Sequence, residues 1–247
     1  MLLPDKSTRQ ALGGSIADMV LYYDSRYSPV QQGGLWKDLT GNGLDGTTFN
    51  RVGSTTSYIE RGVGVRSTGV ADGIRYIGNT TSLAFVHNSS VFAMACWAYF
   101  DGALSDNATL IGNTATRVAK GFWWCVNASN QLRFESYKAN SSQFCISTVT
   151  STATVNINAY NFLCVSCDGS TLTLGVNGVS EDTAVSPNNV AGSATQDCDM
   201  TRAHIGVQSN DYGPLKGYLD RPMIFRKNVT DEKFFALYQA TRHLFGV

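Results

Sequence analysis

The sequence has 247 residues with 19 basic and 19 acidic side chains, so its formal net charge is zero. Nucleic acids and anionic membrane surfaces select partners with a basic face, and this charge balance argues against both. No apolar run is long enough to span a bilayer, so membrane insertion is not expected. Glycine, serine, threonine and asparagine are frequent and turn dipeptides recur. This pattern predicts an all-β domain built as a sandwich or jelly roll.

The N-terminal residues 1–17 are polar, contain a Gly13-Gly14 break and show no sustained periodicity. We therefore expect residues 1–17 to form an extended arm, disordered or docked on a neighbouring protein, ahead of a single domain over residues 18–247. Residues 1–6 lack the basic-then-apolar order of a secretory signal, so export by such a signal is not expected.

The domain is predicted to begin with a strand over residues 19–23, followed by a compact loop over residues 36–46. One tryptophan and two leucines anchor this loop. Its Gly41-Asn42-Gly43 core requires left-handed backbone, which glycine and asparagine tolerate.

Central strands follow in the middle of the chain. Residues 91–100 are almost wholly apolar, which predicts a strand covered on both faces. Residues 121–127 and 131–137 alternate between apolar and polar side chains, so they are predicted to pair as a hairpin. One face of this hairpin carries Phe122, Trp124, Val126, Leu132 and Phe134. The opposite face carries Trp123, Arg133, Glu135 and Tyr137.

A second hairpin over residues 160–178 is predicted to lie at the centre of a sheet. Asp168-Gly169 supplies the turn, and strict alternation places Leu172, Leu174 and Val176 on one buried face.

The chain is predicted to close with strands over residues 203–207 and 217–225 and a terminal helix capped by Thr230. An apolar stripe with helical spacing predicts that this helix packs flat on the sandwich. The stripe consists of Phe234, Leu237, Tyr238 and Thr241.

The six cysteines are compatible with three disulfides, although a chain of this length does not need them. Cys164-x-x-Cys167 resembles half of a zinc site. Residues with that spacing on a strand face opposite ways, however, so buried free thiols are the preferred interpretation.

Several motifs, in their order along the chain, resemble the laminin-G-like, concanavalin A-like lectin/glucanase jelly-roll superfamily. The most specific is Trp36-x-Asp38-Leu39-Thr40-Gly41-Asn42-Gly43-x-x-Gly46. The resemblance covers about residues 18–245 and implies a two-sheet antiparallel jelly-roll sandwich with one short C-terminal helix. Arg221-Pro222 departs from the family pattern, and because proline removes a ladder donor, we expect its strand to be bulged or at an edge. Residues 20–29 resemble a subgroup found in bacteriophage structural proteins.

Catalysis is not expected from the sequence. Glycosidases of this fold place carboxylates at alternate strand positions as Glu-x-Asp-x-x-Glu, and no such run occurs. The three histidines are scattered, and no nucleophile-elbow pattern is present. A glycan hydrolase with an unrecognised site is the weakest of the interpretations left open.

The resemblance implies one structural Ca²⁺ and no other cofactor, because relatives often hold this ion with oxygen ligands. The implied ligand is Asp220 in the last strand, with Asp24 or Asp38 contributing from the first strand and the loop. Alternatively, Asp38 only satisfies amide groups of its own turn.

An exposed aromatic ring that can stack on a pyranose, with polar groups around it, favours a sugar site. Two groups of residues meet this description, and a subunit contact or a covered face is the alternative for the first group. The first group is Trp123, Arg133, Glu135 and Tyr137, and the second is Asn210, Asp211 and Tyr212.

Together these observations favour a non-enzymatic virion structural or surface protein, such as a bacteriophage capsid decoration, neck or tail component assembled in the host cytoplasm. It would dock to other virion proteins as a homo-oligomer and bind cell-surface glycans. The alternative is a secreted, extracellular lectin-like module that binds carbohydrate.

Overall fold

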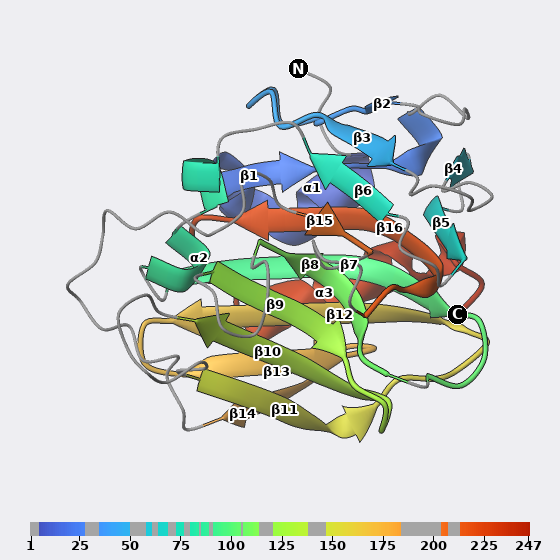
Figure 1. Cartoon of the computed structure of the whole chain (residues 1–247). Coiled ribbons are helices and arrows are strands. Elements are labelled where there is room, and N and C mark those ends of the chain that lie inside the picture. Colours follow the sequence, from blue (N-terminus) through green and yellow to red (C-terminus); the bar gives the residue numbers. More distant parts are fainter. Residues whose placement is uncertain are drawn as a thin grey trace.

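Two antiparallel sheets face each other in the computed structural model, as expected for a concanavalin A-like jelly-roll sandwich (Figure 1). The structure describes residues 5–27, 35–49, 58–60, 64–68, 73–76, 80–83, 85–88, 91–104, 106–113, 121–137, 147–183, 204–206 and 213–247. No helix in these ranges is long and apolar enough to cross a membrane.

Each sheet has eight strands within the described ranges. The first sheet runs in the order β14 (Val179–Thr183), β13 (Leu172–Val176), β12 (Tyr160–Asp168), β7 (Val91–Phe100), β16 (Lys216–Phe225), β5 (Gly64–Thr68) and β4 (Tyr58–Glu60), and β1 (Met19–Tyr22) also pairs with β16. The second sheet runs in the order β11 (Ser147–Thr154), β10 (Gln131–Tyr137), β9 (Gly121–Val126), β8 (Ala108–Gly112), β15 (His204–Ile205), β6 (Gly73–Tyr76), β3 (Gly46–Phe49) and β2 (Leu35–Trp36). Both predicted hairpins are confirmed, as β9–β10 and β12–β13.

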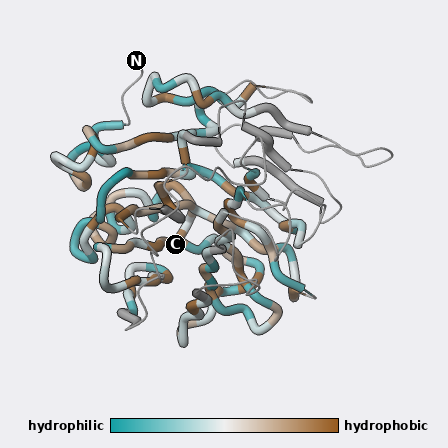
Figure 2. Tube along the Cα trace, turned by 60° about the vertical axis from the view of Figure 1, so that its left-hand side comes forward, coloured by the Kyte–Doolittle hydropathy of each residue, from teal (hydrophilic) through white to brown (hydrophobic). Residues whose placement is uncertain are grey.

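The main core lies between the sheets, where the inward faces of the strands meet. Figure 2 shows hydrophobic stretches interspersed with hydrophilic ones along the chain trace. Phe92 of β7 and Phe134 of β10 join the layers with ring centroids 5.1 Å apart. All five apolar residues predicted for the inner face of the β9–β10 hairpin belong to this core.

A second apolar cluster covers the outer face of the first sheet. Here α3 (Asp231–Thr241) packs on the sheet, as its apolar stripe predicted, with Phe234, Leu237 and Thr241 buried. Trp97 of β7 stacks on Phe245 at 4.4 Å between ring centroids, and its Nε1 donates to Thr241 Oγ1 at 3.0 Å. Thr230 does precede the helix, but its hydroxyl makes no capping hydrogen bond, contrary to prediction.

The segment predicted to be an extended arm is helical instead. Helix α1 (Lys6–Leu12) and the 3₁₀-helix η1 (Gly13–Asp18) lie beside α3, where Lys233 Nζ donates to Ser15 Oγ at 2.8 Å (Figure 1). Asp5 caps α1 by accepting the Thr8 amide at 2.9 Å. A helix this short is too brief to show an apolar periodicity in the sequence, and tertiary packing stabilises it. The remaining described helices are also short: η2 (Ser25–Tyr27), η3 (Thr80–Leu83), α2 (Phe85–Asn88) and η4 (Arg242–Leu244).

Arg221-Pro222 produces a bulge in β16, one of the two possibilities expected from the proline. The pairing of β16 with β7 shifts register between Asp220 and Met223, and Arg221 has φ of +50°. The strand is not at an edge, because β16 pairs with β7, β5 and β1. The bulge turns the Arg221 side chain into a buried position, where it is 1% exposed.

Candidate functional site

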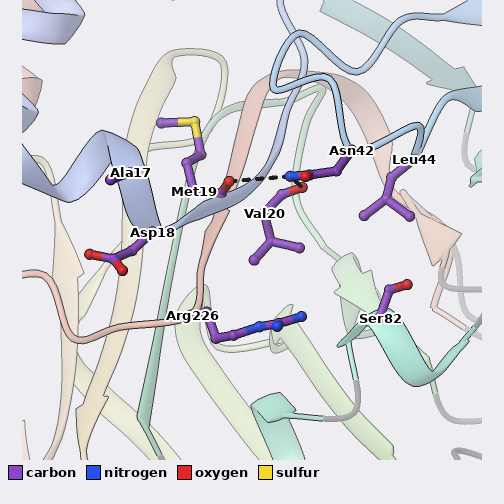
Figure 3. Close-up of a pocket in the computed structure, with 8 residues that line it drawn as sticks. All are labelled: Ala17, Asp18, Met19, Val20, Asn42, Leu44, Ser82 and Arg226. Carbon is purple, nitrogen blue, oxygen red and sulfur yellow. Dashed lines mark hydrogen bonds between the residues drawn. The ribbon is translucent and has the colours of Figure 1, made fainter.

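A surface pocket of about 400 Å³ opens beside β1 (Figure 3). Its lining combines apolar side chains with polar ones that can donate and accept hydrogen bonds. The lining residues are Ala17, Asp18, Met19, Val20, Asn42, Leu44, Ser82 and Arg226. They come from η1, β1, the loop after β2, η3 and the end of β16, so the pocket exists only once these distant segments have packed together.

Asn42 is positioned by the glycine-flanked loop that the sequence singled out. Gly41 and Gly43 have φ of +86° and +74°, as predicted for this turn. The Asn42 Nδ2 donates to the Val20 carbonyl at 2.9 Å and to Thr40 Oγ1 at 2.9 Å. With its nitrogen engaged in this way, the amide oxygen is the group that Asn42 can offer to a ligand.

Asp38 organises the same loop from inside. Its carboxylate accepts hydrogen bonds from the amides of Thr40 at 3.0 Å and Leu44 at 3.2 Å, and from the Thr40 hydroxyl at 2.7 Å. Trp36 is fully buried beneath the loop, with its ring centroid 4.8 Å from that of Tyr23. The interpretation of Asp38 as a residue that satisfies turn amides therefore accounts for its contacts.

Arg226 provides the positive charge of the pocket. Its backbone amide donates to the Asp18 carbonyl at 2.8 Å, and its guanidinium carbon lies 5.1 Å from the centroid of the Phe85 ring. Stacking of this kind uses the face of the guanidinium and leaves its N–H edge available. The nearby Asp18 carboxylate is 3.7 Å from Lys227 Nζ.

The residues predicted to stack on a sugar do not form such a site. Trp123 is fully buried, and its Nε1 donates to Thr109 Oγ1 at 3.0 Å. Gly213 lies against this ring, because a Cβ added to Gly213 would lie 3.3 Å from Trp123 Cζ2. Trp123 therefore has no free ring face for a pyranose, and the sugar assignment of this residue is wrong.

Arg133 and Glu135 form an ion pair on β10, and Glu135 is 1% exposed. This carboxylate is therefore paired within the protein and is not accessible to a ligand from solvent. Tyr137 ends β10, where its backbone pairs with Gly121, and its side chain lies outside the described part of the structure. Asn210, Asp211 and Tyr212 also lie outside the described residues.

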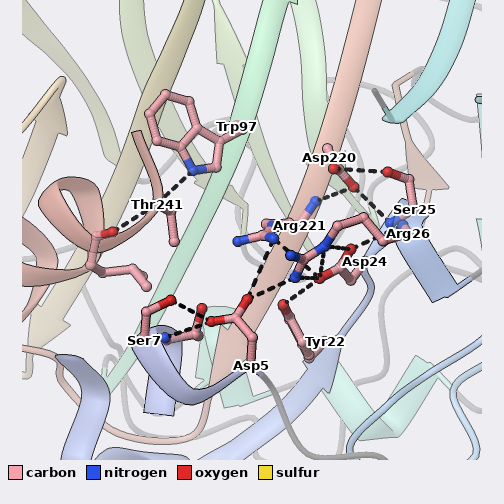
Figure 4. A network of polar contacts seen from close by, with 12 residues as sticks. Asp5, Ser7, Tyr22, Asp24, Ser25, Arg26, Trp97, Asp220, Arg221 and Thr241 are labelled. Carbon is pink, nitrogen blue, oxygen red and sulfur yellow. Dashed lines mark hydrogen bonds and ion pairs between the residues drawn. The ribbon is translucent and has the colours of Figure 1, made fainter. Parts of the chain in front are cut away.

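The metal residues proposed from the resemblance are brought together only in part. Asp24 and Asp220 enter one buried network beside the start of α1 (Figure 4). Asp38 stays in its own loop. Asp220 accepts the amides of Ser25 at 3.0 Å and Arg221 at 2.8 Å, and the Ser25 hydroxyl at 2.9 Å.

Two arginines neutralise the carboxylates of this network. Asp24 lies 2.5 Å from Arg26 Nη2 and 3.4 Å from Arg221 Nη2. Asp5, which caps α1, lies 2.7 Å from Arg26 and 3.5 Å from Arg221. The network therefore ties the N-terminal helix to the bulge in β16.

The charges in the network have opposite effects on its carboxyl groups. Burial, together with the nearby Asp24 charge, raises the pKa of Asp220 to about 6. Burial also opposes ionisation of Asp24, but the Arg26 hydrogen bond and the Arg221 charge outweigh it and lower the pKa of Asp24. Asp24 is therefore an ion at neutral pH whose charge is met by guanidinium groups.

These residues do not fit a calcium ion. Two guanidinium groups already contact the Asp24 carboxylate, and they would repel a divalent cation placed there. Within the described ranges, no cluster of at least three histidine, cysteine, aspartate or glutamate side chains could hold a metal. The sequence anticipated the bulge at Arg221-Pro222 but not that it brings the Arg221 guanidinium to Asp24, because this contact joins segments far apart in the chain.

The described cysteines are buried thiols, as preferred from the sequence. Cys96, Cys125, Cys164 and Cys167 are free and buried. Cys167 faces the core between the sheets and Cys164 faces the cluster under α3, which confirms that they point in opposite directions. Cys145 and Cys198 lie outside the described residues.

Comparisons with known proteins match this architecture. The family model described as the concanavalin A-like lectin/glucanases superfamily matches residues 72–233. A search of curated proteins finds no match to the sequence. The comparisons do not show the bacteriophage subgroup.

Three solved structures illustrate the likeness. Trypanosoma rangeli sialidase superposes with a TM-score of 0.60 at 13% identity, covering 92% of this chain and 33% of the sialidase chain. Domain 4 of AbnA, a GH43 extracellular arabinanase from Geobacillus stearothermophilus, in complex with arabinotriose, has a TM-score of 0.59 at 16% identity and covers 90% of this chain and 98% of that one. The binding domain of botulinum neurotoxin serotype D has a TM-score of 0.60 at 11% identity, covering 93% and 52% of the two chains.

These neighbours correct the expectation that the chain is not an enzyme. They include sialidases and a mutant sialidase displaying trans-sialidase activity, so proteins with this fold do occur in glycosidases. The missing Glu-x-Asp-x-x-Glu run therefore does not separate this chain from enzymes. The chain spans about a third of the sialidase chains, and at 13% identity the likeness shows the fold alone. With the family model covering most of its length, the chain belongs to the concanavalin A-like lectin/glucanase superfamily.

Proposed function

We propose that this domain binds carbohydrate and that the pocket beside β1 is its sugar site. The observation that carries the proposal is the composition of the pocket, where Val20 and Leu44 supply apolar surface next to Asn42, Ser82 and Arg226. Sugars present both C–H patches and hydroxyl groups, so their sites need apolar contact together with convergent donors and acceptors.

The polar groups of the pocket are complementary to sugar hydroxyls. Asn42 offers an amide oxygen as acceptor, Arg226 offers N–H donors, and the Ser82 hydroxyl can do either. Asn42 is held by hydrogen bonds to β1, so ordering it costs little on binding. The structural likeness to domain 4 of AbnA, whose structure holds arabinotriose, supports a carbohydrate ligand for a module of this size.

A glycan array followed by calorimetry on the best ligand tests the proposal. Ser82→Tyr places a large side chain in the pocket and is expected to reduce affinity at least tenfold. Lys216→Ala changes an exposed residue of β16 that does not line the pocket, so it should bind like the unmodified protein. Absence of glycan binding by the full chain, or equal binding by Ser82→Tyr, would refute the assignment.

The proposal includes a role in a larger assembly, in which the domain binds cell-surface glycans while docked to virion proteins. An exposed apolar patch supports self-association within that assembly: Val179 at the edge strand β14 is 63% exposed and Phe235 on α3 is 50% exposed. The two lie close together, because a Cβ on Gly178 would lie 3.0 Å from Phe235 Cδ2. Exposed apolar side chains of this kind favour protein contacts. A second copy of the chain is the partner we assign to this patch, and an extracellular lectin without it is the alternative.

Light scattering distinguishes these assemblies. The unmodified chain is expected to form an oligomer, and the double variant Val179→Ser with Phe235→Ser is expected to be monomeric with its glycan binding intact. A monomeric unmodified chain would refute the oligomer.

A further inference from the structure

The charge of the pocket defines which sugars it can select. Arg226 is the one cation among the eight lining residues, and Asp18 is the one anion. Figure 3 shows the Arg226 side chain extending beneath Val20 toward Ser82, away from the Asp18 carboxylate. Asp18 instead lies 3.7 Å from Lys227 Nζ, outside the lining set. The guanidinium therefore faces the pocket without an ion-pair partner among the described residues.

Phe85 lies beside this guanidinium. The guanidinium carbon is over the Phe85 ring, 5.1 Å from its centroid, a cation–π contact that occupies none of the N–H donors. The N–H edge can then form two parallel hydrogen bonds with a planar anion such as a carboxylate. A lysine could not do the same, because an ammonium is a point charge without this fork.

From this geometry we propose that the pocket selects acidic sugars, with the carboxylate of a uronic acid or a similar carboxylated sugar held by Arg226. The Asn42 amide oxygen and the Ser82 hydroxyl then receive the hydroxyl groups of the same ring. The inference rests on the proposed function, since it names the ligand class of that sugar site. It makes Arg226 the specificity-determining residue.

The selectivity follows from the balance of charges. A neutral sugar leaves the Arg226 charge hydrated, whereas a carboxylate replaces that water with charge-assisted hydrogen bonds. Because the site is open to solvent, the gain is moderate and falls with added salt. We expect the carboxylated form of a ligand to bind about tenfold more tightly than its neutral form.

The test uses matched glycans on one array. Each carboxylated glycan is printed beside its methyl ester, which removes the charge and keeps the sugar, and beside a sulfated analogue as a second anion. The full chain is compared with Arg226→Gln, Arg226→Lys and the control Lys216→Gln, which removes an exposed charge of β16 outside the pocket. Thermal unfolding of each variant confirms that it is folded.

The unmodified chain and Lys216→Gln should prefer the acid over its ester about tenfold, and Arg226→Gln should bind both within about twofold. Arg226→Lys should retain part of the preference and lose discrimination between carboxylate and sulfate. Binding without an acid preference, or a preference that survives Arg226→Gln, overturns the inference while leaving the sugar site standing. Absence of binding to every glycan overturns the proposed function itself.

Discussion

Replacing Asp24 with asparagine removes one negative charge from the buried network without changing the shape of the side chain. The asparagine oxygen can still accept the Arg26 amide, which lies 3.0 Å from Asp24 Oδ1. Its nitrogen, however, takes the place of Oδ2, which now receives Arg26 Nη2 at 2.5 Å and the Tyr22 hydroxyl at 3.0 Å. A donor would then face the donors of Arg26 and lie near Arg221.

The size of the expected destabilisation follows from the burial of the arginine that Asp24 neutralises. Arg221 is 1% exposed, and without Asp24 its nearest carboxylate is that of Asp5 at 3.5 Å. Breaking a buried ion pair from one side costs about 3–5 kcal/mol, because the other charge stays desolvated. Loss of Asp24 also lets the pKa of Asp220 fall toward its ordinary range, since Asp24 contributes to raising it, and this offsets part of the cost. We therefore expect a loss of about 3 kcal/mol in the free energy of unfolding, at the lower end of that range.

Equilibrium unfolding in urea at pH 7 measures this loss, and a melting curve should show Tm lowered by about 6–12 °C for a chain of this size. The control is Asp18→Asn, which breaks the exposed pair with Lys227, where the side chains are 37% and 64% exposed. That pair should contribute less than about 1 kcal/mol. A destabilisation by Asp24→Asn below about 1 kcal/mol, or one equal to that of the control, would refute the view that Asp24 compensates a buried cation.

Three further predictions concern the pH dependence and the packing. Because the folded-state pKa of Asp220 is raised to about 6 from 3.8, its ionisation destabilises the fold progressively as pH rises from 4 to 6. Asp220→Asn removes this effect, so urea unfolding should show its stability relative to the unmodified chain increasing by up to about 3 kcal/mol between pH 4 and 7, and a constant difference would contradict the assignment. Thr241→Val leaves the buried Trp97 Nε1 without its acceptor and should cost about 1–3 kcal/mol, whereas an unchanged Tm would show that this bond is dispensable. Gly217→Ala should cost more than about 2 kcal/mol, because φ is +140° and a Cβ would lie 1.9 Å from the Tyr99 carbonyl oxygen. The control Gly14→Ala, where the added Cβ meets no atom within 4 Å, should change the stability by less than about 1 kcal/mol. Similar melting curves for the two variants would refute this reasoning.

The strands and the core were predictable because they follow local periodicity. The alternation in 131–137 places Leu132 and Phe134 on the core face, as observed. The stripe on α3 likewise predicted its buried face, and the Gly41-Asn42-Gly43 turn predicted its left-handed backbone. Each of these properties depends on residues close in the sequence and on which face of a strand or helix is buried, so the sequence alone determined them.

The outer faces and the sites depended on contacts that periodicity does not encode. Trp123 lies on the outer face as predicted, but only the tertiary structure shows that it is buried, with Gly213 against its ring. Helix α1 is stabilised by packing against α3 and by the ion pair of Asp5, its capping residue, with Arg26 in the network around Asp24.

The candidate sugar pocket and the position of the Arg221 cation near Asp24 also depend on the tertiary structure. Arg226 and Asn42 are far apart in the sequence but line the same pocket. Arg221 enters the buried network through a bulge in β16. Long-range packing brings these groups together and sets their burial and charge, so local composition determined the sandwich while tertiary structure decided where it can bind.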